Sequence, residues 1–153
     1  MAVKYWRIPI GGWKRCIHDA ASFESEPEFR AAKLLDADSS VIWWLRNDPV
    51  IFRIATPAGF FEPDFLYSAK RLGLQINGVL EIKGENLWGA PGSEARIKAS
   101  SARLWAAAIH SAGHDPLWEF HEVLGQDAKN AKTVSEMLSQ AVERYEVRPT
   151  ASV

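Results

Sequence analysis

The sequence predicts an α/β domain with a mixed sheet and flanking helices, in the order α-β-β-β-β-α-β-α. Short apolar, β-prone segments alternate with three longer segments in which apolar residues recur at helical spacing. The chain has 153 residues, of which 47% are hydrophobic. This length supports one core and excludes a two-domain enzyme, so we expect a single domain over residues 1–153.

The first 20 residues form a basic and aromatic arm. No acidic residue precedes Asp19. The basic and aromatic side chains of the arm are Lys4, Tyr5, Trp6, Arg7, Trp13, Lys14 and Arg15. We favour an N-terminal strand whose rings pack on the domain, and the alternative is a surface that contacts nucleic acid. The core is expected to follow over residues 21–125.

The first helix is expected over residues 25–36, with Ser25 as its N-cap, Pro27 in the first turn and Glu28 at the third position. Strands are predicted over residues 41–46, 50–56 and 60–67. The Asp48-Pro49 break and the Pro57-Ala58-Gly59 turn separate them, which indicates an antiparallel meander.

The second half of the chain predicts two more strands and two more helices. Asn77-Gly78 is a tight-turn signal directly before a strand over residues 79–83. A loop rich in Gly and Pro follows, and Ser93 caps a helix over 94–111. We expect a last strand over 117–123 and an amphipathic helix over 133–145, so that residues 126–153 form a C-terminal helix and tail.

Charge and composition limit the classes of function. The net charge of -1 means that binding to a polyanion must come from local clusters of basic residues. The single cysteine, Cys16, cannot form an internal disulfide. No apolar run reaches the ~20 residues of a membrane span, so we expect a cytoplasmic protein that does not enter a membrane.

Three charged residues are expected to carry the chemistry. Glu81 and Lys83 share one face of their strand, and Asp64 follows Pro63, a residue that interrupts strands. If the two strands are neighbours, Asp64 and Glu81 converge, and their repulsion requires a proton or a divalent cation between them. Carboxylate oxygens favour Mg²⁺ or Mn²⁺, and a lysine beside such an ion suits phosphodiester hydrolysis.

The sequence resembles the PD-(D/E)XK nuclease superfamily. Glu62-Pro63-Asp64 is followed after sixteen positions by Glu81-Ile82-Lys83, which is similar to the signature of that superfamily. More narrowly, residues 43–47 (WWLRN), Lys98 and Trp105 resemble the C-terminal nuclease domain of type III restriction enzyme Res subunits and related helicase-nuclease proteins. The resemblance covers residues 21–125 and implies a restriction-endonuclease-like fold.

The resemblance also implies roles for individual residues. Asp64, Glu81 and the backbone carbonyl of Ile82 would bind Mg²⁺, for which Mn²⁺ would substitute, and Lys83 would be the catalytic lysine. Glu28 would be the acid of the first helix and a further ligand, or else only part of a capping box with Ser25. The alternative for Glu81 and Lys83 is a solvated strand face with a local ion pair.

Other side chains have weaker signals. Lys98 starts on the buried face of its helix and would either reach the site as a catalytic residue or extend to solvent. Glu62 is an extra ligand or an exposed carboxylate, and Trp88 stacks on a base or packs. We set aside a zinc site at His110 and His114, because Gly113 ends the helix between them, and we find no phosphate-binding loop.

The expected function is Mg²⁺-dependent hydrolysis of DNA. The resemblance implies helicase or translocase partners and methyltransferase or specificity subunits, and the chain could form a homodimer. One alternative is a catalytically silent nucleic-acid-binding or docking module with the same fold. Another is a structural interaction domain whose tryptophans face a protein partner.

Overall fold

A four-stranded mixed sheet forms the centre of the protein. The computed structural model describes residues 5–84 and 92–145. The sheet has the order β3-β6-β7-β8. β6 is antiparallel to β3 and β7, whereas β7 and β8 are parallel. The strands are β3 (Val41–Arg46), β6 (Phe65–Arg71), β7 (Leu74–Lys83) and β8 (Leu117–Leu124).

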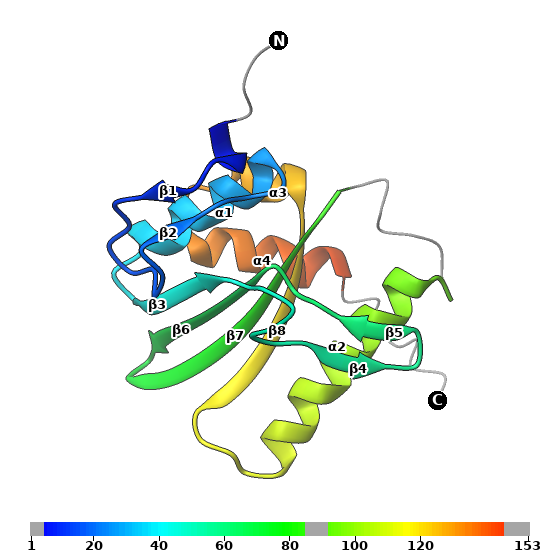
Figure 1. The fold of residues 1–153 in the computed structure, drawn as a ribbon. Coiled ribbons are helices and arrows are strands. Elements are labelled where there is room, and N and C mark those ends of the chain that lie inside the picture. The colour runs from blue at the N-terminus through cyan, green and yellow to red at the C-terminus, as the bar shows by residue number, and fades with distance from the viewer. Residues whose placement is uncertain (1–4, 85–91, 146–153) are drawn as a thin grey trace.

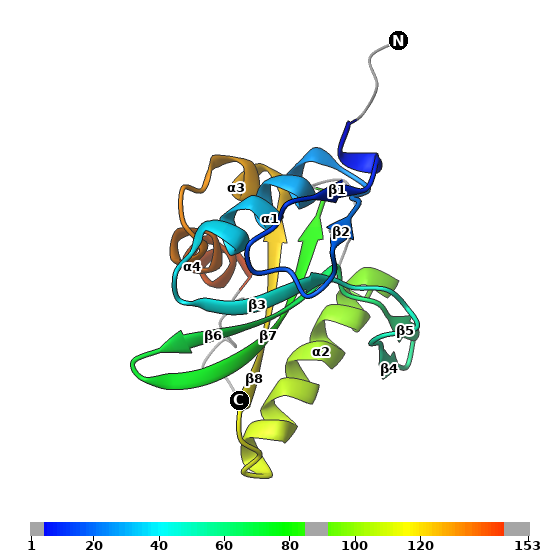
Figure 2. The same ribbon diagram turned by 60° about the vertical axis from the view of Figure 1, so that its left-hand side comes forward.

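Helices cover both faces of this sheet. Three helices lie on one face: α1 (Glu26–Ala37), α3 (Gly125–Asn130) and α4 (Val134–Tyr145). The helix α2 (Glu94–Ser111), which connects β7 to β8 in the chain, lies on the other face (Figure 1, Figure 2). The predicted mixed α/β sheet with flanking helices is confirmed, and it is consistent with a restriction-endonuclease-like fold. The helices α1, α2 and α4 were expected, whereas the short α3 was not.

The alternation of side chains along the strands builds two hydrophobic clusters. Phe65 and Leu80 belong to the cluster under α1, α3 and α4. Their neighbours Leu66 and Val79 belong to the cluster under α2. Because side chains of successive strand residues point to opposite faces, each apolar strand contributes to both clusters. This alternation also decides on which face each charged strand residue lies.

The predicted meander differs from the structure in its middle. The segment expected as one strand over 60–67 is β5 (Gly59–Phe61) and β6, separated by Glu62, Pro63 and Asp64. The strand expected over 50–56 is only β4 (Ile54–Thr56), because the amides of Ile51 and Phe52 turn back to the carbonyl of Asp48. β4 and β5 form a separate hairpin beside α2, outside the main sheet.

The expected turn at Asn77-Gly78 is wrong, since both residues lie inside β7. The chain turns instead at Leu72 and Gly73, both of which have positive φ angles, of 53° and 78°. A Cβ atom at position 78 would collide with the ring of Tyr67, its cross-strand neighbour on β6. The glycine is therefore needed for close packing rather than for a turn.

The N-terminal arm packs on the domain, as we favoured. It contains the short helix η1 (Tyr5–Arg7) and the strands β1 (Ile10–Gly11) and β2 (Ala20–Ala21). The ring of Trp13 contacts those of Phe23, Phe29 and Trp44 at centroid distances of 5.0–6.2 Å. Within the described ranges, no helix has the length and apolar character to cross a membrane.

A half-buried polar cluster around Glu119 on β8 supports the sheet on the α4 side. Glu119 accepts hydrogen bonds from Tyr67 Oη and Arg71 Nη1, both at 2.7 Å, and lies 2.6 Å from His121 Nε2. Burial raises the pKa of Glu119, but the hydrogen bonds from His121 and Arg71 outweigh that effect and lower the pKa to about 2. The carboxylate is therefore more stable in the folded chain than in the unfolded one.

Replacing Glu119 by Gln should lower the free energy of unfolding at neutral pH by about 3 kcal/mol. Because folding lowers the pKa from 4.5 to about 2, the contribution is complete above the higher value and is lost as the pH falls through the lower one. Urea unfolding of the parent and Glu119→Gln across this pH range measures it. The exposed Glu24, changed to Gln, is the control, and a pH-independent difference for Glu119→Gln would contradict the account.

Candidate active site

The interruption before β6 is held by Asn47, which directly follows β3. The Asn47 side-chain amide donates hydrogen bonds to the carbonyls of Pro63 and Phe52, both at 2.9 Å. Its backbone N–H donates to the carbonyl of Asp64 at 2.7 Å. Pro63 has no N–H and cannot extend the β6 ladder, so the chain bends here. The bend places Asp64 at the end of the sheet, one residue before β6 begins.

Asp64 and Glu81 come together at this end of the sheet. Asp64 Oδ2 accepts a hydrogen bond of 2.8 Å from the backbone N–H of Ile82, which follows Glu81 on β7. The two carboxyl groups lie within hydrogen-bonding reach of each other. Glu81 Oε1 is buried and accepts no hydrogen bond from the described residues. The convergence that the sequence predicted is therefore present.

Lys83 forms an ion pair with Glu81 and lies near a second carboxylate, that of Glu122. Its Nζ is 3.3 Å from Oε2 of Glu81, which shares its face of β7. Glu122 on β8 is the register partner of Glu81 and is also buried. Burial raises the pKa of Glu122, and the charge of Lys83 opposes that rise. The ammonium group is thus held at the edge of the Asp64–Glu81 pair.

Glu28 reaches the same region from the first turn of α1, but it pairs with Arg46. Glu28 Oε1 lies 2.7 Å from Arg46 Nη2, and the same nitrogen lies 3.5 Å from Asp64 Oδ1. Ser25 caps the helix as expected, since its hydroxyl accepts from the Glu28 N–H at 3.3 Å and donates to Glu28 Oε2 at 3.1 Å. Glu28 therefore takes part in both the cap and an ion pair.

The carboxyl groups of the site resist ionisation. Burial, and next the charge of Asp64, raise the pKa of Glu28 to about 7. Burial and the nearby Glu81 raise the pKa of Asp64 well above its ordinary value. Burial also raises the pKa of Glu81, against the opposing effects of Asp64 and Lys83. Buried acids with this excess of negative charge favour a shared proton or a bound cation.

The donor set fits a hard divalent cation. Asp64 and Glu81 offer carboxylate oxygens, the ligands that Mg²⁺ and Mn²⁺ prefer, and no donor among the described residues competes for Glu81 Oε1. Ile82 could add its backbone carbonyl. In the part of the chain that the structure describes, no three His, Cys, Asp or Glu side chains gather closely enough to hold an ion. Glu28 is thus not grouped with Asp64 and Glu81.

The remaining residues expected at the site lie apart from this pair. Lys98 Nζ forms an ion pair of 2.8 Å with Glu94, one turn earlier on α2. No contact in the described ranges joins Lys98 to Asp64 or Glu81. Glu62 is exposed and lines the cleft beside the site. Trp88 lies outside the described residues.

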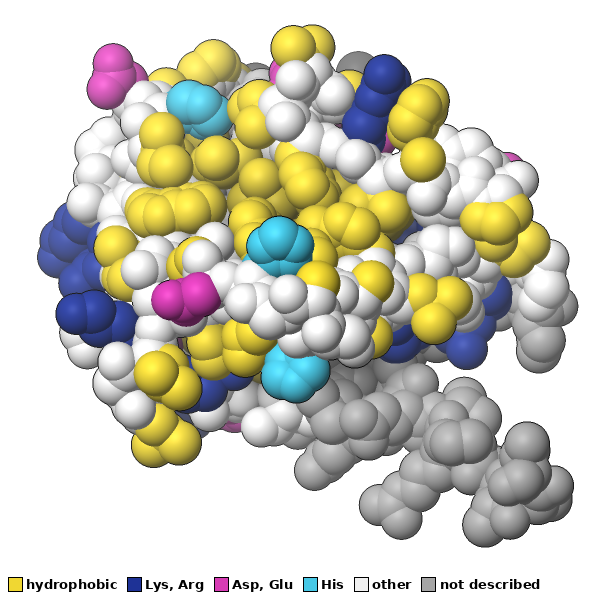
Figure 3. All heavy atoms as spheres, turned by 90° about the horizontal axis from the view of Figure 1, so that it is seen from below, with side chains coloured by type: hydrophobic (Ala, Val, Ile, Leu, Met, Phe, Trp, Pro, Cys, Tyr) yellow, Lys and Arg dark blue, Asp and Glu magenta, His cyan; other side chains and the backbone are white. Residues whose placement is uncertain are grey.

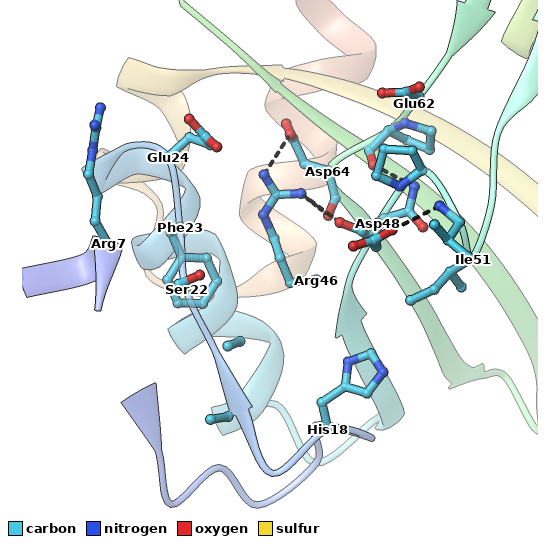
Figure 4. Close-up of a pocket in the computed structure, with 16 residues that line it drawn as sticks. Arg7, His18, Ser22, Phe23, Glu24, Arg46, Asp48, Ile51, Glu62 and Asp64 are labelled. Atoms are coloured by element: carbon cyan, nitrogen blue, oxygen red, sulfur yellow. Dashed lines mark hydrogen bonds and ion pairs between the residues drawn. The ribbon is translucent and has the colours of Figure 1, made fainter. Parts of the chain in front are cut away.

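A cleft of about 940 Å³ opens beside the site. Asp64 and Arg46 line it together with the η1 residue Arg7, the exposed His18 of the arm and the turn after β3. Figure 4 shows the Arg46 side chain directed toward Asp64, with Arg7, His18 and Glu62 around the opening. The cleft is open to solvent and reaches the Asp64 side of the pair.

Sequence reasoning missed three contributors. Arg46 and Asn47 were noted only as part of the WWLRN string, without a role, because their contacts depend on tertiary structure. Glu122 had a usable signal: it alternates with Trp118 and Phe120 on β8, and both of these pack in the cluster under α2. A charged residue on that face is unexpected and marks the site.

Comparison with known proteins places the chain in context. A family model described as an endonuclease domain matches residues 14–117. That range includes the bend at Pro63 and the residues Asp64, Glu81 and Lys83. No curated protein and no solved structure shows a significant match to the chain.

Replacing Asn47 by Ala should lower the free energy of unfolding by about 1–3 kcal/mol, because the partly buried carbonyl of Phe52 and the buried carbonyl of Pro63 lose their donor. Urea unfolding at neutral pH measures the loss. The matched control is Asn130→Ala, at an exposed amide whose removal should change stability by less than about 0.5 kcal/mol. Equal effects of the two substitutions would show that Asn47 does not hold the bend.

Proposed function

The chain belongs to the endonuclease domain family, and on this premise we propose that it is a deoxyribonuclease that requires a divalent cation. The family membership makes it a nuclease with DNA as substrate. We propose Mg²⁺ as the cation, with Mn²⁺ as a substitute, because the paired groups are carboxylates. The observation that carries the proposal is the contact of the Asp64 and Glu81 carboxyl groups beside Lys83.

The chain's own residues divide the work of phosphodiester hydrolysis. Asp64 and Glu81 would hold the cation at the end of β7. A bound Mg²⁺ would lower the pKa of a coordinated water and neutralise charge on the phosphate. Lys83 orients the attacking water and stabilises the additional negative charge of the transition state. The ion pair with Glu81 keeps the Lys83 ammonium in position, and the charge of Lys83 also acts on the nearby Glu122.

The cleft beside Asp64 is the proposed path of the DNA strand. Its volume of about 940 Å³ accommodates a few nucleotides, and Arg7 and His18 on its arm side can contact phosphates. The face seen from below is less suited to DNA. Figure 3 shows an extensive hydrophobic area in the middle of this face, and Lys and Arg side chains mainly at the edges of the face. Such a face attracts a polyanion weakly.

Sequence choice is proposed to come from other polypeptides. With a net charge of -1, the chain has little overall attraction for DNA, which suits a domain that a partner holds on its substrate. The resemblance to Res-type helicase-nuclease proteins supports a translocase and a methyltransferase or specificity subunit as partners in a restriction or defence system. A homodimer would bring two active centres to the duplex, one for each strand.

Lys83→Ala and Asp64→Asn should each lower the rate of plasmid cleavage by about 100-fold or more, since each removes a group that acts on the transition state. The measurement is conversion of supercoiled DNA in Mg²⁺ or Mn²⁺. The control is Lys129→Ala, which removes an exposed positive charge from α3 and should cleave like the parent. Equal cleavage by all four proteins would contradict the site, and none by any would favour the silent docking module.

Arg7→Ala should weaken DNA binding and make the slope of log K against log salt shallower by about 0.9, as expected for one lost phosphate contact. Fluorescence anisotropy with a short duplex at several salt concentrations measures the slope. Lys129→Ala, outside the cleft, should leave it unchanged. If the two variants behave alike, the DNA does not follow this cleft.

A further inference from the structure

We propose that Arg46 serves as a built-in cation between Glu28 and Asp64, so that the centre takes one divalent ion, shared by Asp64 and Glu81. The proposal rests on the nuclease function above, since it concerns the same carboxyl groups. It makes Arg46 a positioning residue, which acts on the reaction through Asp64. It also removes Glu28 from the metal ligands that the resemblance implied.

The guanidinium of Arg46 is fixed from several sides. Nη2 lies 2.7 Å from Glu28 Oε1 and 3.5 Å from Asp64 Oδ1. Nη1 donates hydrogen bonds to the backbone carbonyls of Asp64 at 2.9 Å and of Asn47 at 3.2 Å. Arg46 therefore contacts both the side chain and the backbone of Asp64, and the planar guanidinium cannot shift without losing several contacts.

The same contacts put a positive charge where a second ion would bind. In two-metal centres the ions lie about 3.5–4 Å apart and share a carboxylate. Besides Glu81, the carboxylate near Asp64 is that of Glu28. Arg46 Nη2 lies between Glu28 and Asp64 and contacts both. A divalent ion at that point would face a guanidinium at contact distance, and the two positive charges would repel each other in this half-buried setting.

Arg46 and Glu81 lie on opposite faces of the sheet. Arg46 is the cross-strand partner of Phe65, and its guanidinium lies over the Phe65 ring, which belongs to the cluster under α1. Glu81 alternates with Leu80 and so shares the opposite face with Val79, under α2. Asp64, placed at the sheet end before β6 begins, is the residue that contacts groups on both faces. Among the described residues, Glu28 is not grouped with Asp64 and Glu81 closely enough to share an ion with them.

A titration of the full chain with Mn²⁺ in the absence of DNA tests the stoichiometry. Free Mn²⁺ is followed by electron paramagnetic resonance, and Asp64→Asn reports binding elsewhere on the surface. We expect one ion per parent chain after this correction. Glu28→Gln should keep that ion and weaken its binding by about 10- to 100-fold at most, the range for groups that act through a ligand.

Two substitutions of Arg46 test its charge. Arg46→Lys keeps a positive charge and should bind one ion, whereas Arg46→Gln leaves Glu28 and Asp64 without a counter-ion and should bind a second, weaker ion. Circular dichroism and thermal unfolding show whether each variant folds. If Arg46→Gln does not fold, the parent and Glu28→Gln titrations decide the proposal.

The outcomes are distinct. One ion in the parent and in Glu28→Gln, and two in a folded Arg46→Gln, support the proposal. Two ions in a parent that cleaves DNA, loss of the ion in Glu28→Gln, or one ion in a folded Arg46→Gln would overturn it while the nuclease function stands. If the parent binds no more Mn²⁺ than Asp64→Asn, both the proposal and the metal-dependent function fail.

Discussion

The structure depends on the close approach of two carboxyl groups, those of the half-buried Asp64 and the buried Glu81. Burial raises the pKa of both groups, and the charge of Glu81 raises that of Asp64 further. A folded chain that keeps such a pair must balance the charge with a proton or a cation. The Ile82 N–H and the Lys83 ammonium supply part of that balance at 2.8 Å and 3.3 Å. A divalent cation would supply the rest, which connects the geometry to nuclease chemistry.

Residues on both faces of the sheet hold this pair in place. Asn47 holds the bend at Pro63 by hydrogen bonds to backbone carbonyls, and Arg46 holds Asp64 from the α1 face of the sheet. On the α2 face, the parallel pairing of β7 and β8 brings Glu122 beside Glu81. Since the strands alternate their side chains between two hydrophobic clusters, a slip of one residue in register would exchange Glu81 for Leu80 and destroy the site.

The sequence predicted the convergence of Asp64 and Glu81 better than it predicted the residues that hold them in place. Pro63 predicted the bend, and the alternation of side chains along the strand predicted that Glu81 and Lys83 share a face. Both signals are local in the sequence. The Asn77-Gly78 turn was wrong, since the glycine serves the ring of Tyr67, a contact that only the paired strands reveal. The contacts of Arg46 and Asn47 join β3, α1 and the bend, so no local pattern marks them. Lys98 follows helical spacing correctly yet pairs with Glu94 on its own helix.

Diffraction from crystals soaked in Mn²⁺, recorded at the manganese absorption edge, tests the central claim most directly. The account predicts one anomalous peak between the carboxylates of Asp64 and Glu81, at the 2.0–2.2 Å or so from their oxygens that a small divalent ion adopts. A peak found only elsewhere, or none at this pair under conditions in which the protein cleaves DNA, would contradict it.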